Sequence, residues 1–537
     1  MDNIIVSHVQ VRPSRTAGNG LFATQDIKAG ELVLSIKRPL IGVLDVPRLE
    51  DSCSNCFLWT GDNEGVMSSY DSDDQAQTVN ACTGCNQVGY CSKKCQSQAW
   101  KREHKHSCKF LKDYPPLPSA IRAARELAVF MNSDADDVAK AALRQLEKHT
   151  VLTVSDDAGG SSDSMKEAFG VSSQATQDIL VREGLHGDDS GQGEDYIGQI
   201  WRNSLTLVTP TFDPLGLALD PLICSANHSC DPNTVVVMDG PSISIRSLLP
   251  VRKDSEIFIS YIDHTNPYLV RQRELRERYC FTCACTKCVR GPMTREDAWT
   301  RSISKISARD FDNILKNTGL NLPASASSED PLLRLSALEA FAFRELETAR
   351  GLLKSATTAP TAATIPRLES VLALCGKSTL YPPTRQPYAA ARNELFAALL
   401  ENGSDTNVAK ALMHMVKIHF SIDPVLYPEP FHPVRVVHSW TLVRLLLYLY
   451  DQREEHAVTA KLVGQGFDFV VVIWRLLREL WVLVTKSHGL GSGFAGKVGD
   501  TVRAVAEEIG EANLKVLERD PGGVWEVFIA WKDAMEF

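Results

Sequence analysis

The chain has 537 residues, 44% of them hydrophobic, which is enough for two to four domains with apolar cores. Its formal net charge of −9 argues against a protein whose main role is to hold a phosphate backbone, and it suits lysine-rich protein substrates. The longest apolar run, 467–484, is interrupted by charged side chains, so we expect a buried helix there rather than a membrane span. Because Met1–Gln10 has no basic segment followed by an apolar core, we expect no secretory signal.

The first 50 residues contain short β-like runs at 4–11 and 32–36. Between them lies the stretch Ala17-Gly18-Asn19-Gly20, in which glycine allows a tight turn and a close approach of the backbone to a ligand. A plain turn joining two strands is the simpler interpretation, and the stretch taken alone favours it.

Residues 53–108 carry four consecutive pairs of potential metal ligands, with two or three residues between the partners of each pair. Zinc binds four thiolate or neutral imidazole ligands in a tetrahedron, so four such pairs indicate two zinc ions. Disulfides are the alternative, but without a secretory signal this spacing favours metal. The eight residues are Cys53, Cys56, Cys82, Cys85, Cys91, Cys95, His104 and Cys108.

Four more thiols follow, one at Cys230 and three in the stretch Cys283, Cys285 and Cys288. With the first eight residues they make twelve ligands, the number that three tetrahedral zinc sites need. We expect the remaining three cysteines, Cys224, Cys280 and Cys375, to be small buried hydrophobic residues. The basic side chains at 93–109 indicate a solvated face more than a DNA contact, which they support only weakly.

The rest of the chain changes from mixed to helical patterns. Amphipathic stretches at 121–131 and 138–146 predict helices, whereas the Gly-, Ser- and Asp-rich stretches 155–164 and 187–195 predict loops. Strand-like runs follow at 205–208, 234–238, 242–248 and 256–261. Beyond about residue 291 only helical patterns continue, including a buried helix expected at 432–450, and no clean repeat period is visible.

Two further motifs are more specific than the glycine turn. The stretch Asn227–Asn233 (NHSCDPN) is rich in side chains that hydrogen-bond the local backbone, so it predicts a non-repetitive crossing that presents polar groups to a small ligand. The strand-like run 256–261 then ends on Tyr261, and the cysteine stretch follows. In this order, the motifs over about 4–290 resemble the SET-domain protein lysine methyltransferases, and the inserted ligand pairs resemble the SET and MYND-domain subfamily.

The resemblance implies an α+β multidomain fold. A β-rich SET domain would be interrupted by a zinc-binding MYND finger and a helical insert, followed by a post-SET zinc segment and an α-helical, tetratricopeptide-like C-terminal domain. The implied boundaries are 1–50 for the N-terminal SET part, 53–108 for the MYND finger, 109–195 for the helical insert with flexible loops, 196–263 for the SET core, 264–290 for the post-SET segment and 291–537 for the helical domain. The C-terminal domain is expected to pack over the SET face and limit access of the substrate.

The resemblance also pairs the zinc ligands. It implies a cross-braced finger in which Cys53, Cys56, Cys91 and Cys95 hold one ion and Cys82, Cys85, His104 and Cys108 hold the second. The third ion would be held by Cys230, Cys283, Cys285 and Cys288.

The cofactor of the family is S-adenosylmethionine, and the resemblance implies its contacts. Ala17, Gly18 and Asn19 would meet its methionine end, Asn227 and His228 would meet it from the NHSCDPN crossing, and Phe281 would pack on the adenine. His149, Asn203 and Tyr261 are further implied contacts, and for His149 a surface or core role is an equal alternative.

Tyr261 and Tyr279 match the two tyrosines that line the lysine channel in the family, and are the implied catalytic residues. A narrow apolar channel lowers the pKa of the substrate amine from about 10.4 by desolvating the ammonium. Positioning of the reacting groups can then contribute about 7–11 kcal/mol of the barrier. For Tyr261, the competing interpretation is a packed strand tyrosine.

The resulting hypothesis is a protein-lysine N-methyltransferase that acts on histone or other proteins, with three structural zinc ions and S-adenosylmethionine as cofactor. A non-catalytic scaffold that recruits partners through the MYND finger and the helical domain is the alternative, and a disulfide-rich extracellular module is a distant third. We further expect peptide partners for the MYND finger, a monomer without membrane attachment, and a nuclear and cytoplasmic location.

Overall fold

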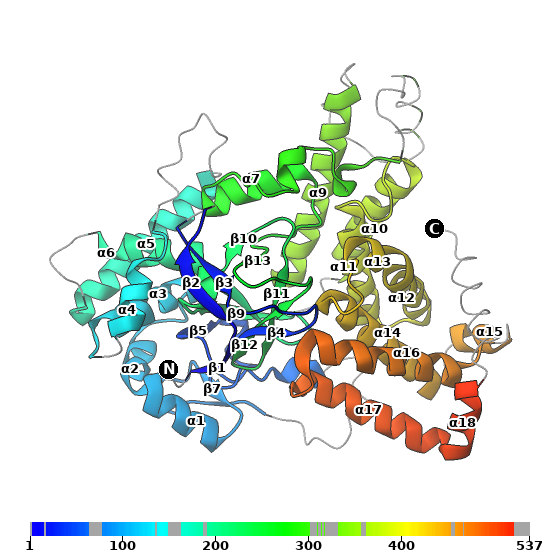
Figure 1. Cartoon of the computed structure of the whole chain (residues 1–537), viewed down its shortest axis with the longest axis horizontal. Coiled ribbons are helices and arrows are strands. Elements are labelled where there is room, and N and C mark those ends of the chain that lie inside the picture. The colour runs from blue at the N-terminus through cyan, green and yellow to red at the C-terminus, as the bar shows by residue number, and fades with distance from the viewer. Residues whose placement is uncertain are drawn as a thin grey trace. The chain divides into compact units, whose positions relative to one another are not determined.

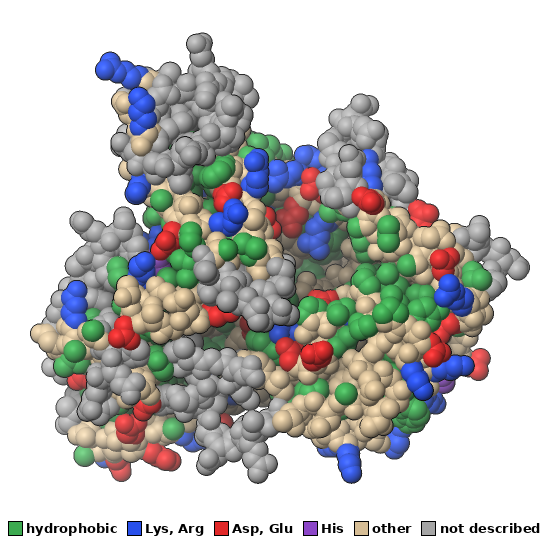
Figure 2. Space-filling model, turned by 180° about the vertical axis from the view of Figure 1, so that it is seen from behind, with side chains coloured by type: hydrophobic (Ala, Val, Ile, Leu, Met, Phe, Trp, Pro, Cys, Tyr) green, Lys and Arg blue, Asp and Glu red, His purple; other side chains and the backbone are tan. Residues whose placement is uncertain are grey.

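The computed structural model describes residues 3–15, 18–63, 78–134, 137–148, 163–185, 191–300, 309, 313, 316, 331–355, 361–452, 457–464 and 467–519 (Figure 1). These residues form two compact units. The first holds most residues up to 289, and the second holds 265–268 and the residues from 290 on. Acidic and basic side chains are interspersed among the described residues on the face drawn in Figure 2.

The first unit is built on three small sheets. The first sheet has the order β1 (Ile4–Ser7), β4 (Leu32–Ile36), β12 (Ser242–Ser247) and β11 (Thr234–Asp239), and the third has the order β5 (Ile41–Leu44), β9 (Pro214–Leu219) and β8 (Leu205–Val208). In β12, isoleucines alternate with polar residues, and burial alternates with them, as expected of a strand with one face on the core. A two-stranded ribbon joins β6 (Asn80–Ala81) and β7 (Gly89–Tyr90).

The second sheet brings together the motifs that lie far apart in the sequence. Its order is β10 (Asn227–His228), β13 (Glu256–Ile259), β3 (Asn19–Ala23) and β2 (Val9–Pro13), which lie side by side within the first unit (Figure 1). Strand β13 pairs antiparallel to β3 and parallel to β10, with His228 opposite Ile259. The NHSCDPN stretch, the glycine turn and the strand that leads to Tyr261 therefore lie next to one another.

Helices surround the sheets of this unit: α1 (Lys93–Ala99), α2 (Lys105–Asp113), α3 (Ser119–Asn132), α4 (Asp137–Arg144), α5 (Asp163–Glu183), α6 (Gln192–Asn203) and α7 (Tyr268–Tyr279), the last of which begins in the second unit. The predicted loop at 187–195 is wrong at its end, because α6 begins at Gln192. Glu194 and Asp195 in its first turn favour a helix start, since they complement the helix dipole. The predicted loop at 155–164 lies mostly outside the described residues.

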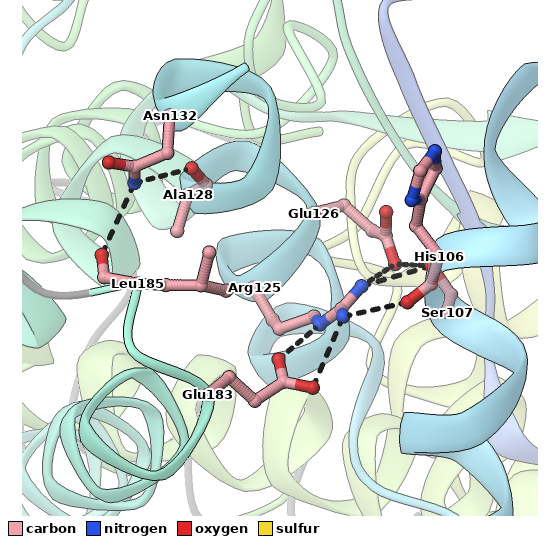
Figure 3. A network of polar contacts seen from close by, with 8 residues as sticks. All are labelled: His106, Ser107, Arg125, Glu126, Ala128, Asn132, Glu183 and Leu185. Carbon is pink, nitrogen blue, oxygen red and sulfur yellow. Dashed lines mark hydrogen bonds and ion pairs between the residues drawn. The ribbon is translucent and has the colours of Figure 1, made fainter.

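A buried arginine joins three of these helices (Figure 3). Arg125 on α3 donates to both oxygens of Glu183 at the end of α5, at 2.8 and 3.2 Å. The same guanidinium donates to Ser107 Oγ at 3.0 Å and to the carbonyl of His106 at 3.1 Å, both on α2. Glu126 Oε1 accepts from Arg125 at 3.0 Å and from the Ser107 hydroxyl at 2.6 Å. The inserted helices are thereby tied to the helix that ends the cysteine-rich region.

The second unit consists of helices in the residues described beyond 290, without any strand there, as predicted. They are α9 (Pro331–Ser355), α10 (Thr361–Lys377), α11 (Tyr388–Asn402), α12 (Asp405–Lys417), α13 (Asp423–Leu426), α14 (Pro433–Asp451), α15 (Ala457–Gly464), α16 (Phe469–Val484), α17 (Gly493–Ile509) and α18 (Glu511–Arg519), with short turns between some of them. Sequential helices α9 to α12 pack on their neighbours, and α16 packs on α14 and α17.

The two helices predicted by residue number in this unit are confirmed. Helix α14 covers the expected 432–450 stretch and buries leucines such as Leu442 and Leu446. Helix α16 is capped by Asp468, which accepts from the backbone of Val470 and Val471, and it is buried on one face only. None of the described helices is long and apolar enough to cross a membrane. A tetratricopeptide-like repeat and the boundaries of the individual domains stay predictions.

Candidate functional site

Three groups of cysteine and histidine side chains converge in the first unit. They are Cys53, Cys56, Cys91 and Cys95; Cys82, Cys85, His104 and Cys108; and Cys230, Cys283, Cys285 and Cys288. Within each group the four donor atoms lie within 4.8 Å of one another. These are the same sets of four that the cross-braced arrangement predicts, and each set is able to hold a zinc ion.

The geometry of the first group fits a tetrahedral metal. Its Sγ atoms are 3.6 Å apart between Cys56 and Cys91 and 3.5 Å apart between Cys91 and Cys95. Zinc–sulfur bonds of about 2.3 Å place thiolates at about 3.8 Å from one another in a tetrahedron. Ser92 fixes the last ligand, because its hydroxyl accepts from the backbone of Cys95 at the start of α1.

The second group combines three thiols with a buried imidazole. His104 Nε2 lies 3.2 Å from Cys82 Sγ and 3.9 Å from Cys85 Sγ, and Cys108 Sγ lies 3.9 Å from Cys82 Sγ. The rings of Tyr90 and Trp100 contact His104 edge-on. Burial lowers the pKa of His104, which favours the neutral imidazole that a metal requires.

The third group links the NHSCDPN stretch to the segment after α7. Cys230 comes from the first, and Cys283, Cys285 and Cys288 come from the second. Gln272 on α7 holds this segment in place, because its amide donates to the Cys283 carbonyl at 2.9 Å and accepts from the Cys283 backbone N–H at 3.0 Å. A metal at this group would therefore fix the residues just before it, including Tyr279 and Phe281.

Next to the third group, polar side chains hold the NHSCDPN crossing against the glycine turn. Asn227 Nδ2 donates to the Asn19 carbonyl at 3.1 Å and to Glu256 Oε1 at 2.8 Å. A Cβ at position 20 would overlap the Glu256 carboxylate, so a larger residue there would displace that side chain from its place beside Asn227. His228 Nδ1 accepts from the Tyr261 backbone N–H at 3.0 Å, which ties the crossing to the end of β13.

A row of rings extends from this crossing. The His228 centroid lies 5.3 Å from that of Tyr261 and 5.8 Å from that of Phe281, and the two tyrosines Tyr261 and Tyr279 are 5.0 Å apart. The Tyr261 hydroxyl donates to the Ala226 carbonyl at 2.7 Å, and the Tyr279 hydroxyl donates to the Tyr261 carbonyl at 3.3 Å. Burial raises the pKa of both tyrosines, so their hydroxyls stay protonated near neutral pH.

A cavity of about 210 Å³ opens beside the two tyrosines. Its wall combines the apolar side chains of Ile223, Ala226 and Ile259 with polar groups. Asn203 lies on the wall and donates to the carbonyls of Glu147 and Gln199. The lining contains none of the twelve cysteine and histidine ligands. The wall is more polar than apolar, and its hydroxyl groups suit the polar end of a long side chain whose aliphatic part contacts Ile223, Ala226 and Ile259.

The remaining predicted residues have different outcomes. Ala17 and His149 lie outside the described residues. Gly18 has φ +45°, a conformation that favours glycine, and the Asn19 amide donates to Gln145 Oε1 at 3.1 Å. Asn19, Asn227, His228 and Phe281 do not line the cavity, whereas Asn203, Tyr261 and Tyr279 do.

Some residues of the site were not predicted from the sequence. Cys375 is buried as expected, but Cys224 lines the cavity and donates to the Asn203 carbonyl at 2.9 Å. Cys280 accepts from the Arg202 guanidinium, and Arg202 also lines the cavity. The contact joins positions 78 residues apart, and no motif surrounds either residue.

Comparisons with known proteins bear on this arrangement. The sequence profile of the SET domain matches residues 18–262. The chain is 29% identical over 310 residues to SET domain and MYND-type zinc finger protein 6 of Schizosaccharomyces pombe, covering 56% of either chain. It is 27% identical over 282 residues to histone-lysine N-methyltransferase ASHR1 of Arabidopsis thaliana, covering 50% of this chain and 53% of that protein.

A human relative gives a similar result. The chain is 27% identical over 277 residues to human histone-lysine N-methyltransferase SMYD3, covering 50% of this chain and 59% of that protein. The matches thus span little more than half the length of these relatives. A solved structure of Rubisco LSMT bound to sinefungin and monomethyllysine aligns over 86% of this chain and 92% of that one, at 14% identity and a TM-score of 0.32.

Proposed function

This chain belongs to the SET and MYND-domain family, as its motifs predicted, and on that premise we propose that it is a protein-lysine N-methyltransferase that uses S-adenosylmethionine. The observation that carries the proposal is the cavity lined by Ala226, the residue just before the NHSCDPN crossing, with Tyr261 and Tyr279 also on its wall. The relatives named as lysine methyltransferases support the same activity.

The wall of the cavity accounts for the first requirement of the reaction, which is a neutral amine. A lysine side chain in this cavity leaves water for the surroundings of Ile223, Ala226 and Ile259, and desolvation lowers the pKa of its ammonium group. The Tyr261 hydroxyl is held at a fixed position by its bond to the Ala226 carbonyl. We propose that this hydroxyl and the neighbouring carbonyls orient the amine lone pair toward the methyl group.

We propose that the cofactor lies on the other side of the two tyrosines. Asn19 and Asn227 would hold its methionine end, His228 would contact it from the crossing, and Phe281 would pack on its adenine. Gly18 and Asn203 complete the proposed contacts, with Ala17 and His149 as further candidates beyond the described residues. When bound, the cofactor supplies an electrophilic methyl group.

We assign a structural role to the three zinc ions. None of their twelve proposed ligands lines the cavity, so a metal at any of the three groups has no direct path to the reacting atoms. The third ion would instead act on the site indirectly, because Cys283 follows Tyr279 and Phe281 closely in the sequence.

We also propose histone or other protein substrates, peptide partners for the MYND finger, a monomeric chain, a nuclear and cytoplasmic location, and a helical C-terminal domain that limits access of the substrate.

The test is transfer of labelled methyl groups from S-adenosylmethionine to proteins of a cell extract, followed by mass spectrometry of the labelled peptides. We expect methylated lysine with the wild-type protein and at least a hundredfold less with Tyr261→Phe, as is typical for loss of an aligned polar group. Tyr114→Phe is the matched control, because Tyr114 is a half-buried tyrosine at the end of α2 and does not line the cavity. A wild-type protein that binds the cofactor or partner proteins but transfers no methyl group would instead favour the scaffold.

A further inference from the structure

Arg202 places a positive charge on the wall of the cavity. It lies on the last turn of α6, and its accessible surface is only 7% of the fully exposed value. The contact that the structure gives its guanidinium is from Nη2 to Cys280 Sγ. Among the described residues no carboxylate forms an ion pair with Arg202, whereas the buried Arg125 and Arg385 each have one.

A guanidinium with so little exposed surface has lost part of its hydration, and no carboxylate compensates for that loss. A sulfur atom satisfies one of its five N–H donors and is a weak acceptor. Since the side chain faces a cavity that a ligand can enter, an anionic group in that cavity would recover the lost interaction. Arg278 also lines the cavity, but its side chain is half exposed and forms an ion pair with Glu274 Oε1 at 3.6 Å.

The lining residues indicate which ligand carries the anionic group. The residues proposed for the methionine end and adenine of the cofactor, Asn19, Asn227 and Phe281, are absent from the wall. Both tyrosines proposed for the lysine are part of it. Asn203, another proposed cofactor contact, does line the cavity, so the cavity borders the cofactor there. Because the contacts of the methionine end and the adenine are absent, we assign the wall around Arg202 to the substrate, and the planar guanidinium is shaped to bind a carboxylate through two parallel hydrogen bonds.

We propose that Arg202 binds a carboxylate of the protein substrate close to the target lysine, so that the enzyme selects lysines with an acidic neighbour. The proposal rests on the proposed function, because it places the substrate lysine in this cavity. It assigns the specificity to Arg202 and only an auxiliary contribution to the exposed Arg278.

The experiment uses fluorescently labelled peptides that contain a single lysine. Glutamate is placed in turn at each of the three positions on either side of the lysine, with glutamine as the isosteric control at the same position. Binding to the full chain is measured by anisotropy with S-adenosylhomocysteine present, and methyl transfer is measured separately. We expect glutamate to be preferred over glutamine at one or more positions by about tenfold in affinity, as for a charge-assisted hydrogen-bonded pair.

Three variants identify the residue responsible. Arg202→Gln should remove the preference for glutamate, and Arg202→Lys should restore part of it, because lysine keeps the charge but lacks the planar fork. Arg252→Gln removes an exposed charge that does not line the cavity and should keep the full preference. A purely structural role of Arg202 would lower the affinity for glutamate and glutamine peptides equally.

The outcomes separate this inference from the proposed function. Glutamate preference in binding without methyl transfer supports the role of Arg202 but not the enzyme. Methyl transfer with equal use of glutamate and glutamine peptides overturns the inference and supports the proposed methyltransferase activity. Equal binding of the two peptides by the wild type also overturns the inference and does not contradict that activity. If Arg202→Gln weakens the binding of the cofactor and not the peptide preference, the carboxylate belongs to the cofactor and the inference is also overturned.

Discussion

The Tyr261 hydroxyl has one hydrogen bond in the structure, to the Ala226 carbonyl, and its other side faces the cavity. If it orients the lysine amine, Tyr261→Phe should reduce kcat by about 10²- to 10⁴-fold. Cofactor affinity and fold should be nearly unchanged, because the ring stays in contact with His228 and Tyr279. Steady-state kinetics and calorimetric titration of the cofactor measure the two effects.

His228→Ala is the comparison for that variant. Its imidazole accepts from the Tyr261 backbone and lies 5.8 Å from the Phe281 ring, so its loss should weaken cofactor binding and local stability together. If both variants lose cofactor binding to the same degree, Tyr261 is a structural residue. If Tyr261 is only a packed strand residue, Tyr261→Phe would lower the free energy of unfolding by about 1 kcal/mol and leave kcat nearly unchanged.

Two histidines of the second unit have opposite titration behaviour. Burial alone would lower the pKa of His438, but its contact with Asp423 at 2.9 Å outweighs burial and raises that pKa above the ordinary value. Burial, with a smaller contribution from Arg435, lowers the pKa of the neighbouring His419 to about 4 despite the opposing effect of Asp423. The first histidine therefore stabilises the fold in acid, and the second destabilises it there.

The sign of the two effects gives a test. The contribution of His438 is complete below about pH 6.5 and is lost as the pH rises through its raised pKa, so His438→Gln should be more destabilising at pH 5.5 than at pH 9. His419 must become charged on unfolding below about pH 6.5, so His419→Gln should be less destabilising at pH 5.5 than at pH 8, by about 1 kcal/mol. Hydrogen exchange of α14 measures both. Parallel pH dependence in the two variants would contradict the assignment.

Single residues were predicted from the sequence where a motif fixes their neighbours. Eight of the proposed zinc ligands form pairs within one turn of chain, so their spacing indicated them, whereas the third set and the division into sets of four came from the ligand count and the family resemblance. The NHSCDPN stretch marked the crossing. Arg202 was missed because its partner Cys280 is distant in the sequence and neither residue belongs to a pattern. Glu256 was missed for a similar reason, since its contacts with Asn227 and the glycine turn depend on the pairing of β3 with β13.

At the scale of the elements, Arg125 joins α3 to α2 and α5 and forms ion pairs with two carboxylates, those of Glu126 and Glu183. Arg125→Met should destabilise the first unit by about 2–3 kcal/mol, because it leaves Glu126 and Glu183 without their cation in a partly buried place. Urea unfolding followed by hydrogen exchange of α2, α3 and α5 tests this. Arg144→Met, which changes an exposed arginine on α4, should have little effect. Equal stability of the two variants would show that the network contributes no net stability.

The strands β8, β11, β12 and β13 and the helix α14 lie where the sequence predicts them, because alternation and helical periodicity are local properties. The order of the strands was not predicted. The parallel pairing of β10 with β13 and the position of β3 between β13 and β2 depend on contacts across long stretches of sequence. The start of α6 at Gln192 was missed because a polar, glycine-rich composition outweighed the apolar Ile197 and Ile200 that anchor the helix.

At the scale of the whole chain, the two units differ in their dependence on metal. All three groups of zinc ligands lie in the first unit, and the described residues of the second unit contain no such group. We expect three zinc ions per chain in the purified protein, two in Cys95→Ser and three in Cys375→Ser, whose thiol is buried among helices. Elemental analysis measures these numbers, and one ion or fewer in the wild type would contradict the cross-braced assignment.

Removal of the zinc should therefore unfold the protein unevenly. Thiolate ligation contributes directly to the free energy of folding, so a strong chelator should expose the amides of α1 and of the segment around Cys283 to hydrogen exchange. The second unit is stabilised by its own apolar core, with Leu442, Leu446 and Leu477 fully or nearly fully buried, and α14 and α16 should keep their protection. The segment that carries Tyr279 and Phe281 should lose its order with the third ion, so affinity for the cofactor should fall as zinc leaves and return when zinc is added back. Equal loss of protection in α14 and α1 would mean that the helical unit depends on the metal sites for its fold.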